Sequence, residues 1–118
     1  MTRAATTIFV FGVYVLVLGA MLIFLPNLVI GPFGFPEARE PWIRVLGVVT
    51  LTLGGYYVAA ARKNVTPFFS WTVVGRFTIL LAFVALVLAG LAPPALIAFG
   101  LFDAVGAAWT WAALRRPN

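Results

Sequence analysis

The sequence predicts an all-α membrane protein, an antiparallel bundle of four transmembrane helices, and its composition and hydropathy pattern carry that prediction. Of 118 residues, 64% are apolar and only 9% are charged, whereas roughly a quarter of the residues in a soluble domain are charged. The apolar residues fall into four runs, each long enough to cross about 30 Å of hydrocarbon. No linker-like segment divides them, so residues 1–118 are expected to form a single four-helix transmembrane domain.

The first helix is expected at residues 6–28, an uncharged stretch whose end is loosened by Pro26. It has no small-residue cleavage signal behind it, which favours a retained helix over a signal peptide. A loop at residues 31–41 follows, rich in helix breakers, and its phenylalanines are expected at the membrane interface. The second helix is expected at residues 42–61, with Pro41 suited to a first-turn position.

The third helix is expected at residues 67–91, after Thr66 as a candidate N-cap and with Pro67 in its first turn. The Pro93-Pro94 pair then forces a tight turn. The fourth helix is expected at residues 95–114, where two arginines follow it. The third and fourth helices are therefore expected to be antiparallel neighbours.

The basic residues predict the orientation of the chain. Those near the N-terminus, after the second helix and after the fourth helix fall on one side of a four-crossing chain, against Arg39 and Arg44 on the other. The positive-inside rule therefore predicts a multi-pass protein whose N- and C-termini are both cytoplasmic. The net charge of +5 does not indicate nucleic acid, because the basic residues lie at helix ends; membrane lipids are the expected partners.

The absence of cysteine and histidine excludes several kinds of chemistry. Neither thiol redox chemistry nor metal or haem ligation by these side chains is available. The three acidic residues, Glu37, Glu40 and Asp103, would make a poor metal site. We therefore expect no metal and no cofactor, and an independent catalyst is disfavoured, although the sequence alone leaves the question of an enzyme open.

Two charged residues lie inside predicted spans, where a charge costs several kcal/mol. Arg76 lies about 15 Å from the predicted cytoplasmic end of the third helix, and Asp103 lies about 18 Å from the cytoplasmic end of the returning fourth helix, so an intramembrane ion pair between them is predicted. The pair could fix helix register only, or it could hold a headgroup, carry protons or contact a ligand. Thr72, Thr110 and the deep Tyr14 are candidates for lining a cavity beside it.

Two further features concern helix ends and helix packing. Arg44 lies within i,i+4 reach of Glu40, which predicts either an ordinary surface pair or a gate at the outer mouth of the bundle. Glycines recur at seven-residue spacing on the first two helices. They suit close packing within the chain, with a dimerisation seam as the alternative.

Six stretches carry a family resemblance: residues 44–47 (RVLG), 53–57 (LGGYY), 60–62 (AAR), 68–76 (FFSWTVVGR), 99–103 (FGLFD) and 109–111 (WTW). Together they resemble small bacterial four-helix membrane proteins, broadly DoxX-like. The resemblance covers nearly the whole chain and implies a compact antiparallel bundle in a bacterial inner membrane. Some DoxX-like relatives are membrane subunits associated with quinone-linked oxidoreductases, but no catalytic motif matches here, so no site residue is carried over.

The leading functional hypothesis is a non-catalytic membrane module, either an accessory or anchoring subunit of a larger membrane complex or a binder of lipid or another hydrophobic small molecule. It is organised around Arg76 and Asp103. One alternative is a small transporter coupled to protons or ions, which would act as a homo-oligomer with Asp103 as the coupling acid. Another is a subunit of a quinone-linked membrane oxidoreductase.

Overall fold

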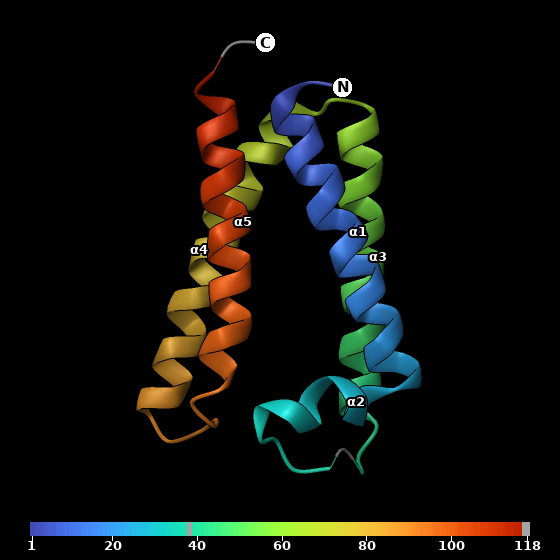
Figure 1. Cartoon of the computed structure of the whole chain (residues 1–118), viewed down its shortest axis with the longest axis vertical. Helices are drawn as coiled ribbons and strands as arrows, with labels where there is room; N and C mark the ends of the chain where they lie inside the picture. Colours follow the sequence, from blue (N-terminus) through green and yellow to red (C-terminus); the bar gives the residue numbers. More distant parts are fainter. Residues whose placement is uncertain (38, 117–118) are drawn as a thin grey trace.

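The computed structural model describes residues 1–37 and 39–116, and every regular element in them is a helix (Figure 1). Four of the helices are long and apolar enough to cross a membrane. The predicted all-helical class with four candidate spans is thus confirmed. The long helices are α1 (Arg3–Phe24), α3 (Trp42–Arg62), α4 (Thr66–Leu88) and α5 (Leu96–Leu114), and the short ones are α2 (Pro26–Ile30) and the 3₁₀ helix η1 (Gly31–Phe33).

The first span both begins and ends earlier than the predicted residues 6–28. α1 begins at Arg3 because the Thr2 hydroxyl oxygen accepts a hydrogen bond from the Ala5 N–H, at 3.0 Å. It ends at Phe24 because a residue before proline is disfavoured in the α region, and Leu25 accordingly has φ −136° and ψ 55°. Pro26 then starts α2, where its missing N–H costs nothing.

The third span also differs from its predicted ends at residues 67 and 91. Thr66 is the first residue of α4 and not its cap, since its hydroxyl donates to the Asn64 carbonyl oxygen at 3.5 Å. α4 ends at Leu88 because Gly90 adopts a left-handed conformation with φ +76°, which lets the Leu91 N–H reach the Leu86 carbonyl oxygen at 2.9 Å. Both ends of α3 and of α5 fall within one residue of their predicted positions.

α1 and α3 form one tightly packed pair, the α1–α3 pair. Glycines bring their backbones together, and the contacts follow in opposite order along the two helices: Gly12 lies against Val58, Gly19 against Leu51 and Gly47 against Ile23. A Cβ atom on Gly19 would lie 2.5 Å from the Leu51 nitrogen. The glycines therefore serve packing within the chain, as the sequence favoured.

α4 and α5 form the second pair, the α4–α5 pair, and the two pairs meet only near the chain termini (Figure 1). We call this the closed end. Its core contains alanine, branched aliphatic and aromatic side chains from α1, α3 and α4: Ala4, Ala5, Ile8, Phe11, Val15, Tyr57, Ala61 and Phe69. From there the pairs diverge toward the opposite end, which we call the open end.

The segment between α1 and α3 spans the open end. The Phe33 ring packs on Phe99 at the start of α5, with centroids 4.5 Å apart, and Phe35 lies near the same ring at 6.4 Å. These phenylalanines, which the sequence assigned to the membrane interface, thus contact the α4–α5 pair. The α2–η1 segment therefore links the two helix pairs where the long helices do not touch.

We expect the Gly19→Ala substitution to lower the free energy of unfolding by about 1–3 kcal/mol, because the added methyl group would overlap the α3 backbone. Gly55→Ala is the matched control, since nothing lies within 4 Å of its added Cβ, and it should be neutral or stabilising. Thermal unfolding of both variants in detergent measures the difference. Equal stability of the two variants would show that the close glycine contacts do not hold α1 to α3.

Candidate functional site

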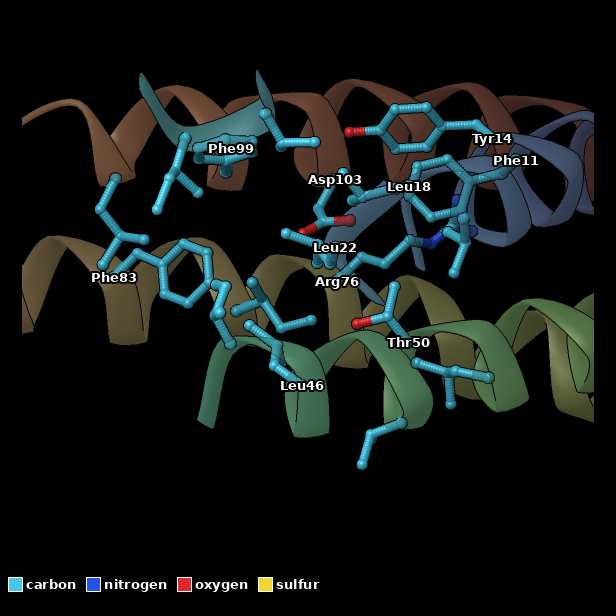
Figure 2. Close-up of a pocket in the computed structure, with 18 of the residues that line it drawn as sticks. Phe11, Tyr14, Leu18, Leu22, Leu46, Thr50, Arg76, Phe83, Phe99 and Asp103 are labelled. Atoms are coloured by element: carbon cyan, nitrogen blue, oxygen red, sulfur yellow. The ribbon is translucent and has the colours of Figure 1, made fainter. Parts of the chain in front are cut away.

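A cavity of about 410 Å³, here called the central cavity, lies between the two helix pairs (Figure 2). Pockets for small ligands usually have volumes of about 300–1,000 Å³ and mostly apolar walls. The central cavity fits that description on both counts. Its apolar wall comes from all four long helices, α2 and the following loop, and includes Leu18, Leu22, Ile30, Leu46, Leu53, Ile79, Phe83 and Phe99.

Five polar side chains also line the central cavity: Tyr14, Thr50, Tyr57, Arg76 and Asp103. In Figure 2 Arg76 and Asp103 lie near the middle of the view, with Phe83 and Phe99 toward the open end and Phe11 and Tyr14 toward the closed end. The cavity therefore has an apolar part near the open end and a polar part deeper inside.

Arg76 is almost fully buried, at 1% exposure, and threonines hold its guanidinium. Nε donates to the carbonyl oxygen of Thr72, one turn earlier on α4, at 3.2 Å. Nη2 donates to the hydroxyl oxygens of Thr72 at 3.0 Å and of Thr110 on α5 at 2.9 Å. Hydrogen bonds to a charged group contribute more than those between neutral groups, so this arrangement offsets much of the cost of burial.

The threonine hydroxyls extend this network to α1. The hydroxyl oxygens of Thr110 and Thr7 lie 2.8 Å apart, and the Thr7 hydroxyl donates its single hydrogen to the Ala4 carbonyl oxygen at 2.7 Å. Thr110 must therefore donate to Thr7. One directed chain of hydrogen bonds thus runs from Arg76 on α4 through α5 to α1, at the closed end where the pairs meet.

Aromatic rings and a glycine complete the surroundings of Arg76. Its guanidinium carbon lies 4.7 Å from the centroid of the Phe11 ring and 5.9 Å from that of Tyr57, within cation–π range. A Cβ on Gly106 would lie 2.8 Å from the Phe11 ring and 3.2 Å from Nη1, so only glycine leaves room there. Nη1 itself is buried without a hydrogen-bond partner among the described residues.

The ion pair predicted between Arg76 and Asp103 is not formed in this structure. Among residues 1–37 and 39–116, no nitrogen–oxygen contact of 4.0 Å or less joins them. The guanidinium lies beside Gly106 and Thr110, about one and two turns beyond Asp103 on α5, because the hydroxyl groups hold it toward the closed end. Asp103 instead lines the central cavity, within electrostatic range of Arg76 and Tyr14.

Arg44 has a different partner from the one the sequence suggested. Its Nη1 donates to the carbonyl oxygen of Ile23 in the last turn of α1. Because the break at Leu25 ends the regular backbone pattern of α1, this carbonyl accepts from a side chain, and the positive charge suits the C-terminal end of the helix dipole. No described contact of 4.0 Å or less joins Arg44 to Glu40, and Glu37 pairs with Arg39 at 3.8 Å on the surface.

The remaining sequence candidates divide between the cavity wall and the layer behind it. Tyr14 lines the central cavity, whereas Thr72 and Thr110 do not and instead hold Arg76 from the closed end. Sequence reasoning missed Thr7 and Phe11. The available signal was a hydroxyl and an aromatic ring one turn apart on an apolar helix, a pattern too common to single them out.

Comparisons with protein families, with curated proteins and with solved structures found no match to this chain. The DoxX-like resemblance therefore stays a prediction, and the site is interpreted from its own geometry.

We expect Thr110→Val to lower the free energy of unfolding by about 1–3 kcal/mol, because it leaves an Arg76 N–H buried without an acceptor and Thr7 without its donor. Thr78→Val makes the same change on an exposed face of α4, where the hydroxyl bonds only to the Val74 carbonyl oxygen, and should cost about 0.5 kcal/mol or less. Chemical denaturation in mixed micelles compares them. A Thr110 variant as stable as the Thr78 variant would argue against the network.

Proposed function

We propose that this membrane protein binds one largely apolar molecule, a lipid or another hydrophobic small molecule, in the central cavity. The observation that carries the proposal is an apolar cavity of about 410 Å³ whose polar part is lined by Arg76 and Asp103. Such a cavity matches a molecule with a large apolar part and one polar end.

The polar end of the ligand is expected to carry no net charge. One cation, Arg76, and one acidic side chain, Asp103, line the cavity, so an ionised head of either sign would face a like charge. A hydroxyl group, or an amide that carries an N–H, satisfies both sides. Such a group accepts from a guanidinium, and a hydroxyl or an amide N–H also donates to a carboxylate. The apolar wall toward Phe83 and Phe99 would hold the hydrocarbon part.

Membrane insertion as an antiparallel four-helix bundle belongs to this proposal. Four candidate spans and many exposed large apolar side chains on the long helices support it. The longest dimension, 45 Å, suits a bilayer with its headgroup regions. We place the protein in a bacterial inner membrane with both termini cytoplasmic, on the distribution of basic residues and the DoxX-like resemblance. α3 and α4 make few contacts with each other, which would leave a side path to the cavity for a molecule dissolved in the bilayer.

The binder could act alone, as a homo-oligomer or as an accessory subunit anchored in a larger complex. The transporter and the quinone-linked subunit stay predictions from the sequence. For a transporter, Asp103 would have to take up and release a proton in each cycle.

Single cysteines test the orientation, because the chain has no native cysteine to mask. Asn64→Cys, between α3 and α4, should react with an impermeant maleimide only when the cytoplasmic face is accessible, as in inside-out vesicles. Glu37→Cys, before α3, should react only from the periplasmic face in intact spheroplasts. Labelling of both residues from the same side would contradict the proposed crossings.

A cavity-filling pair of variants tests the binding function. Leu46→Trp adds a bulky ring to the wall of the central cavity, whereas Val45→Trp adds it to the neighbouring exposed position outside the cavity. We expect the wild type and Val45→Trp to co-purify with one neutral amphiphile per chain, detected by native mass spectrometry and by solvent extraction. Leu46→Trp should retain about tenfold less, if steric exclusion removes 1–2 kcal/mol of binding.

Two results would contradict the binding function. One is the absence of any bound amphiphile from wild-type protein purified in a mild detergent. The other is that Leu46→Trp and Val45→Trp are equally stable to heat and retain the same amount of amphiphile. Filling the central cavity would then have no effect on the bound molecule.

A further inference from the structure

A second hollow, of about 460 Å³, lies at the closed end between the start of α1 and the end of α5. We call it the terminal groove. Arg3 and Thr6 line it from α1, and Trp109, Ala112 and Arg116 line it from the opposite side, in or just after α5. The small side chain of Ala112 leaves the space open. The hydroxyl of Thr7, part of the network that holds Arg76, also lines it.

The charge of the terminal groove is positive and uncompensated by acidic side chains. Arg3 and Arg116 come from opposite ends of the chain, yet they line the same hollow. Among residues 1–37 and 39–116, neither guanidinium has an ion-pair or hydrogen-bond partner, whereas the neighbouring Arg115 lies over the Trp111 ring at 4.8 Å. Glu37 and Glu40 belong to the segment at the open end, and Asp103 lines the central cavity.

Two guanidinium groups around one hollow match the chemistry of a phosphate group. Guanidinium donors bind phosphate oxygens in paired, charge-assisted hydrogen bonds. Trp109 lines the same hollow, and tryptophan is typical of the headgroup region of a bilayer. We propose that the terminal groove binds one phosphate-bearing anion through Arg3 and Arg116, with an anionic phospholipid headgroup and a soluble phosphate as the two sources to separate.

This site rests on the membrane placement proposed above but not on a ligand in the central cavity. The control uses Arg62, the last residue of α3, and Lys63, which follows it; both lie on the same predicted face of the membrane and neither lines the groove. If attraction to the groove were only the general pull of basic residues on anionic lipid, removing either pair of charges would have the same effect. A difference between the pairs therefore identifies a defined site.

The test titrates phosphatidylglycerol and phosphatidylcholine into the purified full chain and counts bound lipids by native mass spectrometry. We expect one phosphatidylglycerol to bind preferentially to the wild type and to the Arg62→Gln/Lys63→Gln variant. The Arg3→Gln/Arg116→Gln variant should bind it about 30-fold more weakly, the effect of neutralising two basic residues next to an anionic headgroup. Ala112→Phe, which fills the groove and keeps every charge, should also lose the bound lipid.

Equal weakening in the two double variants would overturn the site, as would a wild type that does not prefer phosphatidylglycerol. Inorganic phosphate is the competing probe: displacement of the lipid at millimolar phosphate would assign the groove to soluble anions, and no displacement would assign it to the lipid headgroup. Leu46→Trp should leave phosphatidylglycerol binding unchanged. A failure of the central-cavity proposal is thereby distinguished from a failure of this one.

Discussion

The burial of the Arg76 guanidinium is the constraint on which the rest of the structure depends. An isolated charge at membrane depth costs several kcal/mol, and it persists only where hydrogen bonds replace water. Here the replacement is supplied by Thr72 and Thr110, with Thr7 extending the network to α1. Since these hydroxyls come from three helices, satisfying the charge joins the α4–α5 pair to the α1–α3 pair at the closed end.

The same constraint explains why a cavity exists. Within the α1–α3 pair, glycines allow the backbones to touch, and Gly100 similarly lies close to Leu80 between α5 and α4. Between the pairs, close contact is concentrated around Arg76 and Phe11, and farther from the termini the pairs separate. At the open end, Phe33 of the α2–η1 segment packs on Phe99 and so covers the space between the pairs. The result is an apolar space whose deep part carries one cation and one acidic side chain.

The sequence was sufficient for the features that depend on composition and local chain chemistry. Four apolar runs, the break near Pro26 and the packing role of the glycines follow from hydropathy, proline geometry and spacing. The hydrogen-bond partners of Arg76 could not be predicted from the sequence. Pairing it with the one acid of suitable depth is reasonable by charge, but the contact with Thr110 depends on how α4 and α5 are rotated about their axes. Likewise, the hydrogen bond from Arg44 to the Ile23 carbonyl could not be predicted, because every residue carries a backbone carbonyl whatever its side chain.

Solid-state NMR of the protein in lipid bilayers, with ¹⁵N-labelled arginine and ¹³C-labelled threonine and aspartate, tests the central arrangement most directly. The structure predicts through-space correlations from the Arg76 guanidinium nitrogens to the Thr72 and Thr110 side-chain carbons, both lost in Arg76→Lys. It also predicts a much weaker correlation, or none, to the Asp103 carboxyl carbon. A strong correlation to Asp103 without one to Thr110 would show that an ion pair, and not a set of hydroxyl groups, holds the buried arginine.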